Sequence, residues 1–316
     1  MADTRAPTAP SLAAPRPGAP RPGAARPGAA SRGRGAGRRP VRPLPVWVRL
    51  VPVVGLGALV VAAVVVPAVH GADPTDVDLS RVLTPPSAEH PLGTDASGRD
   101  VLLRSLAGLR VSLVVGLVAA LVAGLVGTVV GVVAGTAGGW VDRALMRTVD
   151  AIAAVPHLLL GIFVVALFRP SLGAVIASIA LTHWVSTARI VRSIVLALRE
   201  RPYVDAAVLA GAGRLQVALR HHVPAVTPHA LLAWSLMVPH AIMHESALSF
   251  LGLGLPPHLP SLGTMIAQGQ GALLAGQWWP AVTPGAFVVL LGLCVLAASG
   301  ELRRRWSARL PEDERW

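Results

Sequence analysis

The side chains that could perform chemistry in this sequence are few, and the most suggestive of them lie at residues 240–248. His244 and Glu245 begin like the zinc-protease motif H-E-x-x-H, but Leu248 stands where the second histidine is required, which excludes that site here. His240 and His244 are four residues apart, so on a helix they share one face and could bind a metal ion together. Because the sequence shows no third ligand beside them, we predict no metal site, no catalytic residue and no cofactor.

Glu245 is the acidic residue of a strongly apolar stretch at residues 225–250. A carboxylate that faces lipid costs a few kcal/mol. We therefore expect this side chain to face a helix bundle or a cavity. A role in helix packing, or as a gate on a solute path, is predicted in preference to direct contact with a solute.

A second stretch, VDAAVLAGAGRLQVALRHHVP at residues 204–224, is polar and basic but lies between two very apolar segments. Its apolar or small residues recur at steps of three and four, which predicts a helix over residues 204–218 with one apolar face. They are Val204, Val208, Gly211, Leu215, Leu219 and Val223. Glycine lowers helix propensity by ~1 kcal/mol, so we expect a turn or a close contact at Gly211. On spacing alone, a helix that lies on the membrane surface and links two spans is an equal alternative.

All 28 basic residues are arginine, and the sequence contains no lysine. A P-loop requires a lysine that reaches the β- and γ-phosphates, so the chain carries no Walker A site of its own. The formal net charge of +12 raises the question of nucleic acid. Ten arginines precede residue 50, most of them in a proline- and glycine-rich stretch without interleaved aromatic residues. We predict a disordered tail over residues 1–45 that contacts anionic lipid and no nucleic acid.

The composition of the whole chain indicates an integral membrane protein. It is 53% hydrophobic and only 14% charged, against roughly 25% charged residues in a soluble domain. Six apolar segments are each near the ~20 residues that cross ~30 Å of hydrocarbon. They cover about residues 46–69, 111–137, 148–168, 171–191, 225–250 and 281–299. The sequence therefore predicts an all-α, multi-pass bundle with six transmembrane helices.

The arginines orient this bundle, because cytoplasmic loops carry the excess of positive charge. Residues 192–220 and both termini are rich in arginine, residues 251–280 have none, and residues 70–106 have more acids than arginines. We therefore expect both termini in the cytoplasm. The predicted organisation is a tail at 1–45, a first helix at 46–69, an extracytoplasmic segment at 70–106, a core at 107–305 and a cytoplasmic tail at 306–316.

Two stripes of small residues run along the second span. One consists of Gly127, Gly131 and Gly135, and the other of Gly116, Ala120, Gly124 and Thr128. In lipid, small residues let neighbouring helices approach closely and associate. This span is therefore predicted to pack tightly against two neighbours.

Residues 205–224 resemble the cytoplasmic loop motif of ABC importer permeases, which reads Glu-Ala-Ala, three residues, Gly, nine residues and Ile-x-Leu-Pro. The matching residues are Asp205, Ala206, Ala207, Gly211, His221, Val223 and Pro224. Aspartate keeps the charge of the family's glutamate on a shorter stem, and histidine at the isoleucine position is usual in the peptide-type subfamily. The resemblance implies that residues 192–224 form a coupling loop that docks on a separate ATP-binding subunit.

Further stretches resemble the second permease of dipeptide, oligopeptide and nickel importers, among them HPLGTDASGRDVLLR and ESALSFLGLGLPPHLPSLGTMIAQG. They lie at residues 90–104, 135–160, 182–207 and 245–269, and the resemblance spans about residues 46–305. It implies a type I ABC importer transmembrane domain in a bacterial cell membrane. The implied partners are two ATP-binding subunits that hydrolyse ATP, a second homologous permease, an extracytoplasmic solute-binding protein and membrane lipid.

Two other classes remain as alternatives. A polytopic membrane enzyme would need a paired nucleophile and base, or metal ligands, on facing spans, and beyond His244 and Glu245 the spans offer little. An ABC exporter subunit usually has long cytoplasmic helical extensions, and the cytoplasmic loops here are short. Because dipeptide, oligopeptide and nickel systems share the quoted motifs, the resemblance implies a path for peptides or related small solutes and leaves nickel open.

Overall fold

The computed structural model describes residues 45–307 apart from residues 71–72, 74–75, 169 and 257. The chain divides into two units, Met1–Pro43 and Leu44–Trp316, and the first lies outside the described residues. The predicted tails at 1–45 and 306–316 thus fall almost wholly outside the described part of the chain, and their properties stay predictions.

The described residues fold into helices, and among them there is no strand beyond one isolated bridge between Thr94 and Asp100. The α-helices are α1 (Val46–His70), α2 (Val101–Ala137), α3 (Gly139–Ala153), α4 (His157–Leu167), α5 (Leu172–Arg199), α6 (Pro202–Leu209), α7 (Arg214–Val217), α8 (Val223–Phe250), α9 (Leu262–Leu274) and α10 (Trp279–Ser307). A 3-10 turn, η1 (Leu79–Arg81), precedes α2, and a π-helical turn, η2 (Ala218–His222), leads directly into α8. The prediction of an all-α protein is confirmed.

The helices are those of a multi-pass membrane protein. In the described part of the chain, α1, α2, α5 and α10 are long and apolar enough to cross a membrane, and α3 with α4 passes the same test as a bent pair. α8 is not among these, but its 28 residues make it about 42 Å long, which exceeds the ~30 Å of hydrocarbon. These elements correspond in order to the six predicted spans.

The third predicted span, residues 148–168, is not one continuous helix. α3 ends at Ala153, α4 begins at His157, and the two are bent by 86°. Pro156 stands immediately before α4. Proline lacks a backbone N–H and disfavours the helical conformation in the residue before it, so the helix breaks at this point.

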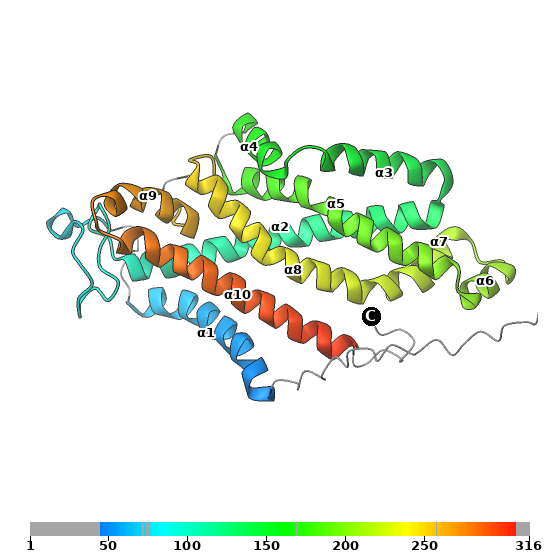
Figure 1. Ribbon diagram of the computed structural model, residues 1–316, viewed down its shortest axis with the longest axis horizontal. Helices are drawn as coiled ribbons and strands as arrows, with labels where there is room; N and C mark the ends of the chain where they lie inside the picture. Colours follow the sequence, from blue (N-terminus) through cyan, green and yellow to red (C-terminus); the bar gives the residue numbers. More distant parts are fainter. Residues whose placement is uncertain (1–44, 71–72, 74–75, 169, 257, 308–316) are drawn as a thin grey trace, which may run out of the picture. The chain divides into compact units, whose positions relative to one another are not determined.

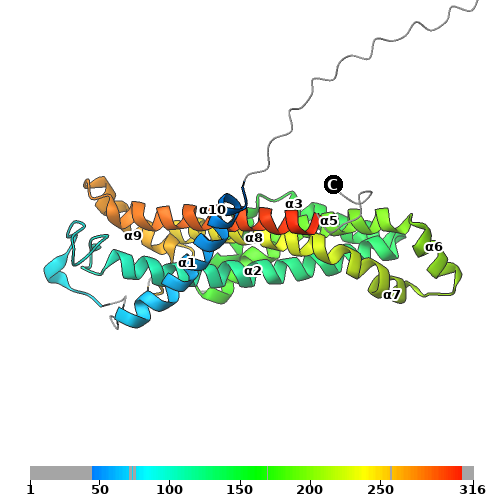
Figure 2. The same cartoon turned by 90° about the horizontal axis from the view of Figure 1, so that it is seen from below.

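α2 is the central helix, and the prediction that it packs on two neighbours is confirmed. A Cβ added at Gly131 would lie 2.7 Å from the carbonyl oxygen of Ala188 on α5. A Cβ added at Gly116 would lie 2.5 Å from Cγ1 of Ile242 on α8. Figures 1 and 2 both show α2 running alongside α5 and α8. Because glycine has no side chain, α5 and α8 approach α2 more closely than a larger residue would allow.

Residues 78–100 fold against the end of the bundle at which α2 begins and α9 lies (Figure 1). Asp100 caps α2 by accepting a hydrogen bond from the backbone N–H of Leu103 at 2.9 Å. Trp279 of α10 donates from its indole Nε1 to the carbonyl oxygen of Thr94 at 3.0 Å. The segment is thereby joined to both α2 and α10.

A buried ion pair holds the same segment to α9. Arg104 of α2 is only 3% exposed and donates to the carboxylate of Asp95 and, at 3.1 Å, to Oε1 of Gln268. Arg99 donates from Nε to the same carboxylate at 2.9 Å. Because breaking a buried pair typically costs about 3–5 kcal/mol, these residues of the HPLGTDASGRDVLLR stretch have a structural role.

Candidate functional site

The predicted coupling residues lie at the end of the bundle opposite to residues 78–100 (Figures 1 and 2). α6 carries Asp205, Ala206 and Ala207, the following turn carries Gly211, η2 carries His221, and α8 opens with Val223 and Pro224. The prediction of one helix over residues 204–218 is wrong, because α6 ends at Leu209 and α7 begins at Arg214. Gly211 adopts φ +88° with no heavy atom within 4 Å of an added Cβ, so it makes the predicted turn and no close contact within the chain.

The apolar face expected for residues 204–218 lies within residues 202–222, which we call the docking segment, and it is largely open. Val204 is buried. The exposed fractions of the other large apolar side chains are 54% for Val208, 88% for Leu209, 72% for Leu215 and 58% for Leu219. Asp205 is exposed, and its carboxylate has no partner among the described residues. Large apolar side chains exposed together on short neighbouring helices are typical of a surface that contacts another protein.

The docking segment is joined to α2 where it returns to the bundle. The hydroxyl of Thr136, near the end of α2, lies 2.9 Å from Nδ1 of His222. Arg199, at the end of α5, donates to the carbonyl oxygen of Gly135 at 3.2 Å. Because η2 continues into α8 without a break, a displacement of the docking segment acts on α2 and α8 directly.

The buried histidine of this region is His222 and not the motif residue His221. His221, the motif residue, is half-buried, and its ring centroid lies 5.9 Å from that of Tyr203. His222 is 1% exposed. Burial, together with the positive charge of Arg199, lowers the pKa of His222 below its usual value, which favours the neutral imidazole at pH 7. The motif comparison gave no signal for this residue, because its importance depends on the position of Thr136.

Two ion pairs tie α3 to α5 near the same end of the bundle. Arg192 contacts Asp142 through both Nε and Nη2, with Nη2 lying 2.6 Å from Oδ2. Arg189 donates to Asp150 at 2.8 Å. A two-bond arginine–carboxylate contact fixes orientation as well as distance. α3 is thereby held against α5 despite the break that separates it from α4.

Glu245 is fully buried, and the expectation that it faces the bundle is confirmed. Ser112 of α2 donates to its Oε2 at 2.9 Å, and Ser249 donates to its Oε1 at 2.8 Å. Ser112 also accepts a hydrogen bond, at 3.4 Å, from the backbone N–H of Leu262 at the start of α9. In this conformation the carboxylate joins α8 to α2 and α9 and has no exposed surface, so its gating role stays a prediction.

A cluster of four histidines gathers where α4, α5 and α8 meet. It consists of His157, His183, His240 and His244. The ring centroid of His244 lies 4.8 Å from that of His157, 4.6 Å from that of His183 and 5.0 Å from that of His240. The argument that no third ligand accompanies His240 and His244 is therefore wrong. His157 is distant in sequence, and only the fold brings it to the pair.

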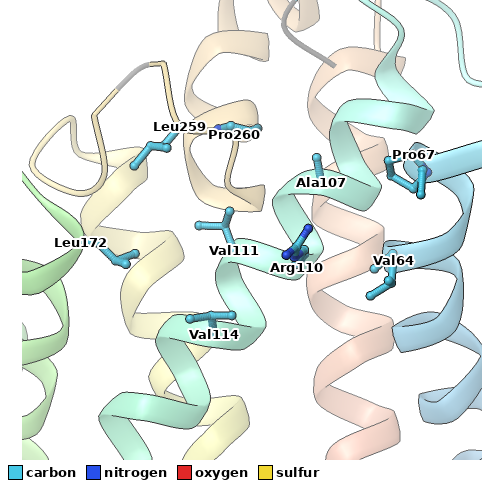
Figure 3. A pocket seen from close by; sticks show the side chains of 11 residues that line it. Val64, Pro67, Ala107, Arg110, Val111, Val114, Leu172, Leu259 and Pro260 are labelled. Carbon is cyan, nitrogen blue, oxygen red and sulfur yellow. The ribbon is translucent and has the colours of Figure 1, made fainter. Parts of the chain in front are cut away.

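A pocket of about 510 Å³ lies elsewhere, between α1, α2 and the connection from α8 to α9 (Figure 3). Arg110 is the single charged residue among those that line it, and the remaining lining is apolar. Figure 3 shows Arg110 between Val111 of α2 and Pro67 of α1. None of the predicted site residues lines this pocket, so the docking segment remains the candidate functional site.

Fold and site together define a class of protein: a multi-pass helical membrane component with exposed apolar side chains on two short helices, α6 and α7, beyond its long spans. The chain belongs to the family of binding-protein-dependent transport system inner membrane components, which matches residues 127–308. That match contains α3, α4, α5, the docking segment, α8, α9 and α10, together with the last part of α2.

Named relatives agree with this assignment. The dipeptide transport system permease protein DppC of Bacillus subtilis is 38% identical over 232 residues, which cover 73% of this chain and 72% of that protein. The nickel transport system permease protein NikC of Escherichia coli K12 is 38% identical over 194 residues, with coverages of 61% and 70%. The oligopeptide transport system permease protein OppC of Bacillus subtilis is 35% identical over 220 residues, with coverages of 70% and 72%. The resemblance drawn from the motifs is confirmed, and the chain is a transport permease component.

Proposed function

We propose that this chain is the membrane permease subunit of an ATP-driven importer and forms the translocation path for peptides or related small solutes, nickel included. ATP hydrolysis takes place in two separate ATP-binding subunits. A second, homologous permease completes the path, and a solute-binding protein delivers the solute at the extracytoplasmic segment, residues 70–106. The distribution of arginines supports cytoplasmic termini and a cytoplasmic coupling loop at residues 192–224 in the bacterial cell membrane.

The observation that carries this proposal is the exposed apolar surface of α6 and α7. Leu209 and Leu215 lie on a segment beyond the long spans, and most of each side chain is open. Burying such a side chain contributes about 1.5–3 kcal/mol, so a groove that accepts both gains substantially. Asp205 lies in the first turn of α6 without a partner among the described residues and is available to a basic group of the ATPase.

The connections of the docking segment support its role in transmitting motion. η2 joins it to α8, and His222 contacts Thr136 at the end of α2. α8 in turn carries Glu245, whose carboxylate is held by Ser112 of α2. Movement of α6 and α7 by the ATPases therefore shifts α8 relative to α2 and strains the hydrogen bonds of Glu245. This is the basis on which we assign a gating role to that residue.

The class of solute is proposed from the printed names of the relatives. Two of the relatives described above are named as dipeptide and oligopeptide permeases, and the third as a nickel permease. Peptides therefore come first, and the solute-binding protein makes the selection between them.

The test of this function is a reconstituted complex with charged substitutions in the docking segment. Leu209→Glu and Leu215→Glu place a carboxylate where we infer an apolar groove, and should reduce both retention of the ATPases during purification and solute uptake into liposomes. Leu274→Glu is the matched control, because Leu274 is 91% exposed at the end of α9 and lies outside both the docking segment and residues 70–106. Abundance in the membrane should be unchanged in all three. Full ATPase retention and uptake in the docking-segment variants would contradict the proposal.

A further inference from the structure

The histidine cluster at the junction of α4, α5 and α8 is used neither by the docking segment nor by the hydrogen bonds of Glu245. Its rings lie 4.6–6.0 Å apart between centroids. One ligand nitrogen from each of three of these rings lies in the same small space, and a shared cation is an arrangement that such a cluster can hold.

The geometry of three of these rings suits a metal ion. The ligand nitrogens of His157, His240 and His244 all lie within 4.8 Å of one another. Metal–nitrogen bonds of about 2.05 Å in a tetrahedral site place ligand nitrogens about 3.3 Å apart. Small rotations of the three side chains can bring their nitrogens to that spacing, because the side chains of His157 and His240 are exposed.

The fourth ring, that of His183, packs against the other three but is not one of the three residues whose ligand nitrogens lie within 4.8 Å of one another. It is 8% exposed, and its Nδ1 lies 2.8 Å from the carbonyl oxygen of Ile179 and 2.7 Å from the hydroxyl of Thr182. Its Nε2 is buried and has no hydrogen-bond partner among the described residues.

The character of the site follows from what surrounds it. Glu245 follows His244 in sequence, but its carboxylate is bound to Ser112 and Ser249 and supplies no ligand. The ligands are therefore neutral nitrogens, which suit nickel, copper and zinc and do not suit magnesium or calcium. His157 and His240 are exposed, so an ion can enter and leave without unfolding the helices.

We propose that His157, His240 and His244 bind one divalent late first-row transition-metal ion beside His183. This goes beyond the proposed function, because it concerns the chain alone and holds whichever solute the importer carries. Sequence reasoning had no access to it, since His157 lies on α4 and the other two ligands lie on α8.

Equilibrium dialysis of the purified full-length chain against Ni²⁺ or Zn²⁺ tests this proposal, with a purification tag that contains no histidine. We expect one ion per chain in the wild type. His240→Ala and His157→Ala should each weaken binding by at least about tenfold. His229→Ala is the matched control, because His229 lies on α8 but outside the cluster, and it should bind as the wild type does. Equal losses in the control and cluster variants, or no ion in the wild type, would overturn the proposal.

A spectroscopic measurement on the wild type does not depend on how the variants fold. Cu²⁺ added at one ion per chain should show electron paramagnetic resonance with splitting from several coordinating nitrogens. The His240→Ala, His244→Ala double variant should lose that pattern. A wild-type spectrum with oxygen ligands alone would exclude the cluster as the binding site.

Discussion

Replacing Gly131 by alanine tests the close contact between α2 and α5. The new Cβ would lie 2.7 Å from the carbonyl oxygen of Ala188 and 2.7 Å from Cβ of Val191. Carbon atoms in favourable contact are about 3.5–4.0 Å apart, so the two helices must separate locally by on the order of 1 Å. One of the obstructing atoms belongs to the backbone and cannot rotate away. We therefore expect Gly131→Ala to destabilise the chain.

The magnitude is best measured against a glycine that meets no obstruction. Gly292 lies in the apolar part of α10 and has no heavy atom within 4 Å of an added Cβ. Both substitutions share the gain in helix propensity, up to ~1 kcal/mol. The difference between them is therefore the packing cost alone, about 1–3 kcal/mol. At roughly 2–4 °C per kcal/mol, the two variants should differ by several degrees in melting temperature.

Thermal unfolding in detergent, followed by the loss of the monodisperse peak in size-exclusion chromatography, measures this difference. We expect Gly292→Ala to melt at or above the wild type and Gly131→Ala to melt below it. Equal melting temperatures in the two variants would refute the reasoning. They would mean that α2 and α5 accommodate a methyl group at residue 131 without a packing cost.

Four further predictions concern topology, the tail, the docking segment and the buried carboxylate. His258 and Gln216 are both exposed. In an otherwise cysteine-free chain, His258→Cys should react with an impermeant thiol reagent in intact cells, and Gln216→Cys should not. The reverse labelling pattern would contradict the proposed orientation. Deletion of residues 2–40 should leave uptake within a few-fold of wild type, and a tenfold loss, about 1.4 kcal/mol, at unchanged abundance would show that the tail takes part in transport. Gly211→Val forces a branched side chain into φ +88° at a cost of about 1–3 kcal/mol; uptake per ATP hydrolysed should fall, whereas unchanged coupling would make the turn irrelevant. Glu245→Ala leaves the hydroxyls of α2 and α8 without their acceptor and should cost about 1–3 kcal/mol in thermal stability, and an unchanged melting temperature would show that this network is not stabilising.

Much of the membrane architecture could be predicted because it depends on local composition. The six apolar segments correspond to helices or helix pairs, and the spacing of Gly127, Gly131 and Gly135 predicted a close helix contact, for which the structure supplies α5 as the partner. Small residues at a four-residue repeat have few other uses in lipid. The burial of Glu245 followed from the cost of exposing a carboxylate to hydrocarbon.

The wrong predictions share a physical cause. Apolar composition shows that a segment can be helical or buried, but it says little about where the helix breaks. The span at 148–168 breaks before Pro156, although its hydropathy is that of a single helix. The helix predicted over 204–218 is divided at Gly211, and most of its large apolar side chains are exposed instead of facing the bundle. α9 was not predicted at all, although Ser261 caps it in a recognisable way.

The two candidate sites also differ in how far they could be predicted from the sequence. The docking segment could be located because its residues are contiguous and match a motif. The histidine cluster could not, because His157, His183 and the pair on α8 are brought together only by the packing of three helices. A set of metal ligands that are far apart in the sequence cannot be recognised from their spacing.

The length of α2 has a mechanical consequence. Its 37 residues make a rod about 55 Å long, almost twice the ~30 Å of hydrocarbon. One end begins at Asp100 among the folded residues 78–100, and the other ends beside His222. A rod of this length that pivots by about 5° around its middle moves each end by about 2.4 Å. Such a displacement is larger than a hydrogen bond can stretch, so the contact between Thr136 and His222 survives a pivot of α2 only when the docking segment moves with it.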